Sequence, residues 1–166
     1  AVTGVQTCAL PISRELLMRL SDETEELDTT LYQDPRQAAV DRAGAIPKAL
    51  QDFARTALDK ALQDPQALAR VLGEYLTEPK ANVWFEERSV SKLPKQLKLD
   101  RRSRMMYDDK HIFLNGESWR ASGRDAQLMR ILADQRALTA SQILGASQSA
   151  KKILLSWLKS GWLKSY

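Results

Sequence analysis

Apolar residues between positions 47 and 77 recur every three or four residues, which is the spacing of one face of an α-helix. The first stripe predicts a helix over 47–63, with Pro47 in its first position. The members of that stripe are Leu50, Phe53, Ala54, Ala57, Leu58 and Ala61. Asp64 and Pro65 restart the pattern as a cap and a first helical residue. The second stripe consists of Leu68, Val71, Leu72, Tyr75 and Leu76.

Two adjacent amphipathic helices with a minimal connection are expected to pack as a hairpin or against a partner. Packing within the chain remains the alternative, but so few helices make a thin core alone. The candidate dimer contacts are Leu50, Phe53, Ala57, Leu68 and Leu72.

A strand-like pattern begins after Lys95. Asn-Gly is a strong signal for a two-residue hairpin turn, so the strands on its two sides are expected to pair. The predicted elements are a strand over 104–107, a turn at Asp108-Asp109, a strand over 110–114, a turn at Asn115-Gly116, a strand over 117–120 and a helix from Gly123.

The last thirty residues predict two short helices and a closing strand. Residues 139–142 have the spacing of a capping box, so a helix begins there, and Gly145 ends it. Apolar residues on one face predict a second helix over 147–159. Gly161 lies where a left-handed C-terminal residue belongs, and 162–166 is expected to be a strand. This order describes a helix-turn-helix within a winged-helix domain.

The fold class is therefore expected to be mainly α with a small β component. A helix capped by Ser13, a break at 31–35 and a short helix over 36–44 precede the helix pair. Trp84 and Phe85 are expected to anchor the linker on a neighbouring domain. The expected parts are a helical dimerisation domain over 13–79, a linker over 80–95 and an α+β winged-helix domain over 96–166.

Charge divides the chain in the same place. Residues 13–91 hold 10 Lys and Arg against 15 Asp and Glu, a net of −5, whereas residues 92–166 hold 15 against 6, a net of +9. This asymmetry predicts two different surfaces and a boundary near residue 90. No apolar run approaches the roughly 18 residues of a membrane span, and a cytoplasmic location is expected.

The first residues do not resemble the rest of a natural protein. The chain does not begin with Met, and residues 2–12 resemble the translation of a widely used short-read library adapter. An ordinary loop and a weak secretory segment are the alternatives, although no basic residues precede the segment as a signal peptide requires. We therefore expect 1–12 to be non-native, Cys8 to carry no function, and an unknown length to be missing upstream of Ser13.

Little catalytic material is present in the sequence. His111 is the only histidine, so no two-histidine, one-carboxylate iron site can be written, and it is expected to be an exposed strand residue. Asp108-Asp109 is interpreted as a turn rather than as an acid–base pair. Neither a glycine-rich phosphate loop nor a nucleophile elbow is found. No catalytic, cofactor-binding or metal-ligating residue is predicted.

The basic half favours nucleic acid as an alternative partner. Cations at the start of the hairpin and of the second short helix would lie near a groove in a helix-turn-helix complex. That helix, however, has few Asn, Gln or Arg residues to contact bases, and a solvated basic face explains the charge equally. The alternative nucleic-acid contacts are Arg101, Arg102, Arg104, Lys151 and Lys152.

A set of short motifs points to one family through its order and spacing. The motifs are Leu31-Tyr32-Gln33-Asp34-Pro35, the helix pair 47–77, Phe113-Leu114-Asn115-Gly116, Leu138-Thr139-Ala140 and Ser160-Gly161-Trp162. Together they make 13–166 resemble the C-terminal portion of bacterial cupin-like JmjC oxygenases, the ribosomal-protein arginine hydroxylases.

The resemblance implies a parent enzyme with an Fe(II)/2-oxoglutarate jelly-roll, then a helical dimerisation domain and a C-terminal winged helix. The jelly-roll, which holds the iron and 2-oxoglutarate ligands, is missing from this chain, so the fragment itself is expected to be inactive and to need no cofactor. A homodimer and a ribosomal protein substrate are implied for the parent. The alternative function is a winged-helix DNA-binding regulator with a helical dimerisation arm.

Overall fold

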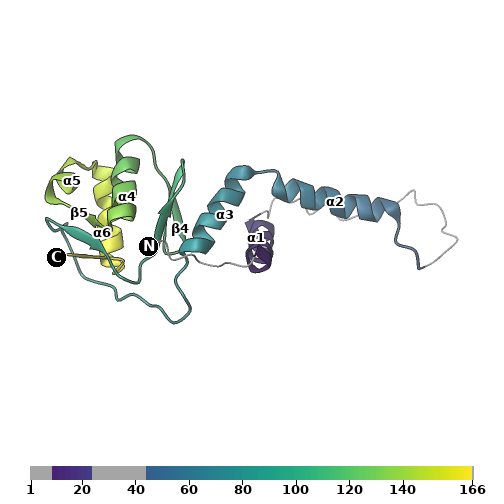
Figure 1. Ribbon diagram of the computed structural model, residues 1–166, viewed down its shortest axis with the longest axis horizontal. Coiled ribbons are helices and arrows are strands. Elements are labelled where there is room, and N and C mark those ends of the chain that lie inside the picture. The colour runs from purple at the N-terminus through teal and green to yellow at the C-terminus, as the bar shows by residue number, and fades with distance from the viewer. Residues whose placement is uncertain (1–8, 24–43, 166) are drawn as a thin grey trace. The chain divides into compact units, whose positions relative to one another are not determined.

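The computed structural model describes residues 9–23 and 44–165. The chain divides into two compact units, Ala1–Val71 and Leu72–Tyr166. The elements, which Figure 1 shows in chain order, are α1 (Ala9–Glu23), α2 (Lys48–Leu62), α3 (Pro65–Thr77), β1 (Leu97–Leu99), β2 (Met105–Tyr107), β3 (His111–Leu114), β4 (Glu117–Arg120), α4 (Gly123–Gln135), β5 (Ala137–Leu138), α5 (Ala140–Gly145), α6 (Gln148–Lys159) and β6 (Leu163–Ser165).

Helix α1 begins earlier than the sequence pattern predicts. It starts at Ala9, so the expected cap at Ser13 is wrong and Ser13 lies inside the helix. Pro11 falls in the first turn, where a backbone N–H has no helical partner and its loss costs nothing. The expected break at 31–35 and most of the expected helix over 36–44 lie outside the described residues.

The boundaries of α2 and α3 follow the predicted caps closely. Helix α2 begins at Lys48, so Pro47 is its N-cap rather than its first residue. Helix α3 begins at Pro65, and the carboxylate of Asp64 accepts a hydrogen bond from the Gln66 backbone N–H at 2.8 Å.

The last turns of α3 pack on the three-stranded sheet β2-β3-β4. Gly73 lies so close to the Phe113 ring that a Cβ atom placed there would be 2.3 Å from it. The Thr77 hydroxyl accepts a hydrogen bond from the Gly116 N–H at 3.2 Å and donates to the Gly73 carbonyl at 2.9 Å. These contacts place the C-terminal half of α3 within the second unit.

The predicted hairpins are confirmed. Strand β3 pairs antiparallel with β2 on one side and β4 on the other, with Met106 opposite Phe113 and Leu114 opposite Glu117. Asn115 and Gly116 both have positive φ, 52° and 90°, as a two-residue turn of the mirror-image type requires.

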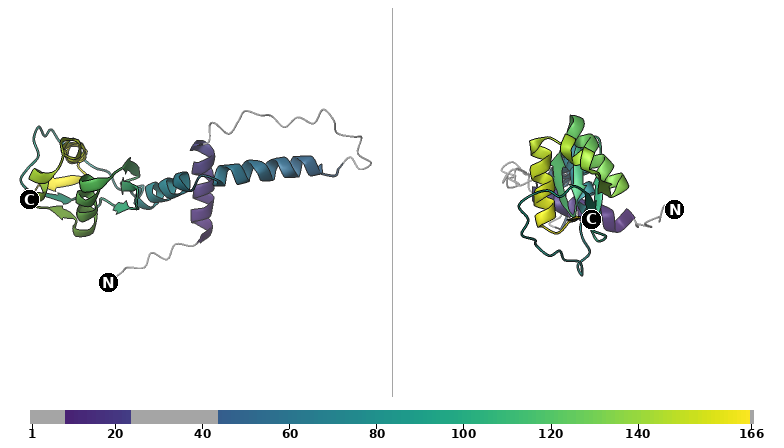
Figure 2. Two further views of the ribbon diagram at one scale, coloured as in Figure 1. Left: turned by 90° about the horizontal axis from the view of Figure 1, so that it is seen from above. Right: turned by 90° about the vertical axis from the view of Figure 1, so that its left-hand side faces the viewer.

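The helix-turn-helix is built against a second small sheet, in which β1 lies between β5 and β6 and pairs antiparallel with both. Helix α4 contacts β5 and helix α6 contacts β6, and Figure 2 shows these green and yellow helices beside the strands. The buried core of this unit consists of Leu97, Leu99, Met105, Ile112, Leu114, Leu128, Met129, Leu132, Leu138, Ile143, Ala150, Leu154, Trp157, Leu158 and Leu163.

The caps of the short helices are those the sequence predicts. Thr139 and Gln142 form a complete capping box at the start of α5. Ser147 caps α6 by accepting a hydrogen bond from the Ala150 N–H at 3.0 Å. Gly161 follows α6 with a φ of +75°, as a left-handed terminator does.

Candidate interaction surfaces

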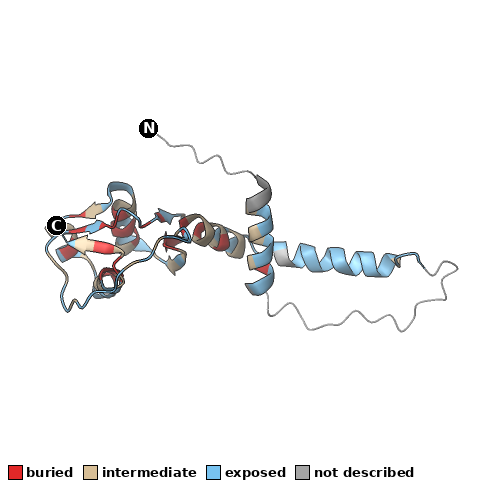
Figure 3. Ribbon diagram, turned by 90° about the horizontal axis from the view of Figure 1, so that it is seen from below, coloured by how far each residue is buried: buried red, intermediate tan, exposed pale blue. Residues whose placement is uncertain are grey.

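Helix α2 carries large apolar side chains that are open to solvent. Leu50 is 37% exposed, Phe53 40%, Leu58 57% and Leu62 47%. Figure 3 shows α2 in the colour of exposed residues along its described length, and Ala57 is exposed as well. Large apolar side chains exposed along one helix make α2 a candidate interaction surface. The structure thus brings three of the candidate dimer contacts, Leu50, Phe53 and Ala57, onto one exposed helix.

The other two candidate dimer contacts lie on α3. Leu68 and Leu72 are both half-buried within the single chain. Leu72 is next to Gly73, whose face packs on Phe113, so this end of α3 already has a partner in the sheet. Less apolar surface is therefore left for a second chain on α3 than on α2.

The helix-turn-helix holds one of its candidate nucleic-acid contacts in a structural role. The Lys151 ammonium donates a hydrogen bond to the Leu144 carbonyl at 2.9 Å, at the C-terminal end of α5. That interaction satisfies a helix-end carbonyl and places the positive charge at the favourable end of the helix. Lys152 is exposed on the same helix, α6, and Leu144 is 76% exposed.

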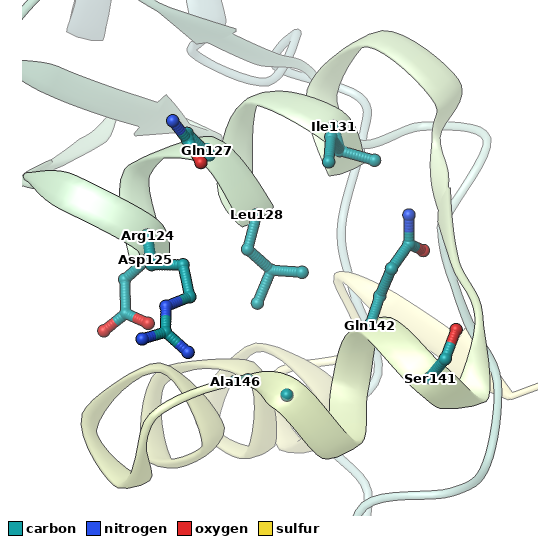
Figure 4. Close-up of a pocket in the computed structure, with 9 residues that line it drawn as sticks. Arg124, Asp125, Gln127, Leu128, Ile131, Ser141, Gln142 and Ala146 are labelled. Atoms are coloured by element: carbon teal, nitrogen blue, oxygen red, sulfur yellow. The ribbon is translucent and has the colours of Figure 1, made fainter.

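A shallow pocket lies between α4 and the turn that joins α5 to α6. Its volume is about 210 Å³. Figure 4 shows the Leu128 side chain pointing into it and the Arg124 guanidinium at its edge. The neighbouring Asp125 carboxylate binds the Ser147 hydroxyl, which ties the start of α4 to the start of α6. The pocket is lined by Leu128 and Ile131 together with one cation, one carboxylate and a few neutral polar side chains, and this mixture defines no ligand.

One of the three candidate arginines near β1, Arg102, binds a buried carboxylate. Asp100 is 1% exposed, and it accepts hydrogen bonds from the Arg102 backbone N–H at 2.9 Å and from Arg102 Nε at 3.0 Å. Lys164 forms an ion pair with the same carboxylate. Arg104 donates to the Glu78 carbonyl at 3.2 Å, and Arg101 is exposed. The structure therefore brings Arg101 and Arg102 together and directs Arg104 toward the end of α3.

Burial and ion pairing compete at Asp100. Burial alone would raise the pKa of the Asp100 carboxyl, but hydrogen bonds from Arg102 and Lys164 outweigh it and hold that pKa well below its usual range. The hydrogen bond between Arg102 and the Asp100 carboxylate also raises the pKa of the Arg102 guanidinium. Asp100 is thus ionised throughout the physiological range and fixes the cations around it.

Sequence reasoning did not identify Asp100, Arg136 and Lys164 as parts of this cluster. Arg136 donates to the Asp100 carbonyl at 2.8 Å and to the Ser103 carbonyl at 3.1 Å. These residues are far apart in the sequence. Lys164 reaches Asp100 when β1 pairs with β6, and Arg136 does so when β1 pairs with β5. The run Asp100-Arg101-Arg102, a lone acid among cations, was the one local signal that could have shown it.

The segment 84–88 packs on the end of α6, and only one of its two aromatic residues acts as an anchor. The Phe85 ring contacts the Trp162 ring edge-to-face with centroids 6.4 Å apart, and the Arg88 N–H donates to the Lys159 carbonyl at 2.7 Å. Trp84, in contrast, is 69% exposed, so its expected anchoring is wrong for this chain. Its carbonyl accepts a hydrogen bond from Arg102 Nη1 at 3.0 Å.

His111 is buried at 6% exposure, so the expectation of an exposed strand residue is wrong. Its strand is buried along its whole length, because Phe113 faces α3 on one side and α4 contacts the strand as well. His111 Nδ1 lies 3.3 Å from an Asp108 carboxylate oxygen, within the turn that the sequence predicts. Within the described ranges, no group of three or more His, Cys, Asp or Glu residues could hold a metal ion.

Three helices, a small antiparallel sheet and a capped turn between the last two helices define a winged-helix domain. The model of the ROXA-like winged helix family matches residues 60–164, and the chain belongs to that family. A comparison with curated proteins found no match. In the described residues, no helix is both long and apolar enough to span a membrane.

Solved structures show the same fold. The structure of the Escherichia coli ribosomal oxygenase YcfD is 17% identical, with a TM-score of 0.74 over 95% of this chain and 46% of that chain. Its complex with cobalt and succinic acid gives 18% identity and a TM-score of 0.71 over 92% of this chain and 46% of that chain. The complex with cobalt and 2-oxoglutarate gives 18% identity and a TM-score of 0.70 over 92% of this chain and 45% of that chain. This chain therefore spans less than half the length of the structures it resembles.

Proposed function

We propose that this chain is the dimerisation and winged-helix part of a cytoplasmic Fe(II)- and 2-oxoglutarate-dependent oxygenase that hydroxylates an arginine of a ribosomal protein. The observation that carries the proposal is the family match over residues 60–164. The fold similarity to structures described as ribosomal oxygenases supports it, as does the order of motifs along the chain.

The proposal divides the labour between this chain and a catalytic part. The iron and 2-oxoglutarate ligands of such an enzyme would come from a jelly-roll upstream, while this chain would contribute assembly. Helix α2 supports that role, because its described side chains are all exposed although Leu50 and Phe53 are large and apolar. Covering such side chains with a second copy removes apolar surface from water, at about 25 cal/mol for each Å².

Light scattering on the 166-residue chain tests the assembly claim. We expect the mass of two chains at micromolar concentration. Phe53→Glu should shift the mass to that of one chain, because a carboxylate buried in an apolar interface is strongly unfavourable. Gln51→Glu adds the same charge on the opposite side of α2 and should leave the dimer intact. A single-chain mass for the wild type would refute dimerisation through α2.

An activity assay tests the oxygenase claim. The complete reading frame, extended upstream to its own start, should add one oxygen atom to an arginine of a ribosomal protein when Fe(II) and 2-oxoglutarate are supplied. Mass spectrometry of isolated ribosomal proteins detects that change. Consumption of 2-oxoglutarate without any modified ribosomal protein would retain the reaction class and reject the substrate. No consumption at all would reject both.

A further inference from the structure

Five cationic side chains gather on the surface around Asp100. Arg102 and Lys164 bind the Asp100 carboxylate, and Arg136 binds the Asp100 carbonyl. Lys98 is opposite Lys164 in the pairing of β1 with β6, so these two side chains lie on one face of the small sheet. Arg101 completes the set. We call these residues, together with Trp84, the basic patch: Trp84, Lys98, Arg101, Arg102, Arg136 and Lys164.

The acidic side chains at this surface do not neutralise it. Asp100 is buried beneath the cations, and Glu86 is the other carboxylate whose charge acts on Arg102. Arg101 is exposed, and its guanidinium makes no hydrogen bond within the described part of the chain. The patch therefore presents an excess of positive charge with at least one unoccupied guanidinium, as a phosphate-binding surface does.

Trp84 supplies an aromatic surface beside these cations. The residue is 69% exposed, while its backbone carbonyl accepts a hydrogen bond from Arg102 Nη1 at 3.0 Å. The next residue, Phe85, lies under the Arg102 guanidinium at 5.4 Å and against Trp162. The exposed indole is thus held on a fixed backbone, and a base could stack on it at little cost in ordering.

An exposed aromatic ring next to fixed cations is the combination that single-stranded nucleic acids require, because bases stack on the ring and phosphates contact the cations. Duplex recognition through α6 is less well supplied, since this helix has no Arg or Asn and a single Gln with which to contact base edges. An acidic peptide would use the cations but would leave the Trp84 ring without a role. We propose that the basic patch binds single-stranded RNA or DNA. The proposal is independent of the proposed function and holds whether or not the parent is an oxygenase.

Fluorescence anisotropy on the full chain tests the proposal with labelled oligouridine, oligothymidine, a duplex of equal length and polyglutamate. Both single strands should bind more tightly than the duplex and polyglutamate, with affinity falling steeply as salt rises. Trp84→Ala should weaken binding about five-fold or more, the lower limit for a stacked base, and Trp84→Phe should restore part of it. If oligouridine binds and oligothymidine does not, the patch is a site for single-stranded RNA, which it would distinguish by the 2′-hydroxyl groups.

Two variants that each remove one positive charge distinguish binding at this patch from non-specific attraction of nucleic acid to the basic chain. Arg101→Ala should weaken binding several-fold and lower the salt slope by about one. Lys152→Ala removes the same charge from the exposed side of α6 and should change binding by less than about two-fold. The proposal is overturned by the absence of binding at low salt, by equal effects of the two charge variants, or by Trp84→Ala leaving affinity unchanged. If Trp84→Ala changes the molar mass of the chain in solution but leaves the affinity for single strands unchanged, the proposal is overturned and Trp84 is a contact between protein chains.

Discussion

Replacing Gly161 with alanine should destabilise the winged helix more than any change at an exposed position. Gly161 has a φ of +75°, and a Cβ atom built there would lie 2.3 Å from the Glu86 carbonyl oxygen. The left-handed conformation costs a non-glycine residue about 1 kcal/mol. The Glu86 carbonyl cannot move freely, because Arg88 is hydrogen-bonded to Lys159 and Phe85 packs on Trp162.

Relieving that overlap requires the 84–88 segment to shift, which we expect to add about 1–3 kcal/mol, the usual cost of overpacking. The total loss is therefore about 2–4 kcal/mol. Urea unfolding followed by tryptophan fluorescence, at one fixed protein concentration, measures it as a lower midpoint with an unchanged slope. Gly161→Asn separates the two causes, because asparagine tolerates positive φ but keeps the overlap.

Gly145→Ala is the matched control. A Cβ atom at Gly145 has nothing within 4 Å, and its φ is not in the left-handed region. Alanine there should leave stability unchanged or raise it by about 0.5 kcal/mol, because it reduces the freedom of the unfolded chain. If Gly161→Ala falls within about 0.5 kcal/mol of the wild type, the packing of 84–88 on the end of α6 is refuted.

Two further changes test other parts of the unit. Asp100→Asn should cost about 1–2 kcal/mol at pH 7, because Arg102 and Lys164 lose a charged hydrogen-bond acceptor but remain partly exposed to solvent. Since folding lowers the pKa of Asp100, its contribution is complete above about pH 5 and is lost as the pH falls further, so acid titration of unfolding should be flatter in the variant. Thr139→Ala removes the capping box of α5 and should cost about 1 kcal/mol in thermal unfolding, with a loss below about 0.3 kcal/mol contradicting the cap.

Local signals in the sequence predicted most of the second unit. The capping box at 139–142, the Asn115-Gly116 turn and Gly161 each act within a few residues, so their structural consequences can be derived without the tertiary fold. The sheet β5-β1-β6 could not be found in this way. Strand β5 has only two residues, and β1 pairs with partners some forty and more than sixty residues away.

The candidate sites were only partly predictable for the same reason. Arg101 and Arg102 were identified from local charge, but Lys164 and Arg136 join them only through strand pairing and a long side-chain reach. The burial of His111 arises because two helices cover its short strand, and a strand of four residues has no periodicity to reveal that. The exposure of Trp84 depends on which residue of an aromatic pair faces α6, which no sequence pattern decides. The division into 13–79, 80–95 and 96–166 stays a prediction beside the observed units.

The central claim is that this chain is one part of a ribosomal oxygenase. Independent long-read sequencing of the source locus upstream of the codon for Ser13 tests it most directly. The account predicts an in-frame jelly-roll with a His-x-Asp…His set, and a natural sequence in place of residues 2–12. A start codon close to Ser13 would contradict the account and leave a stand-alone winged-helix module with a helical arm.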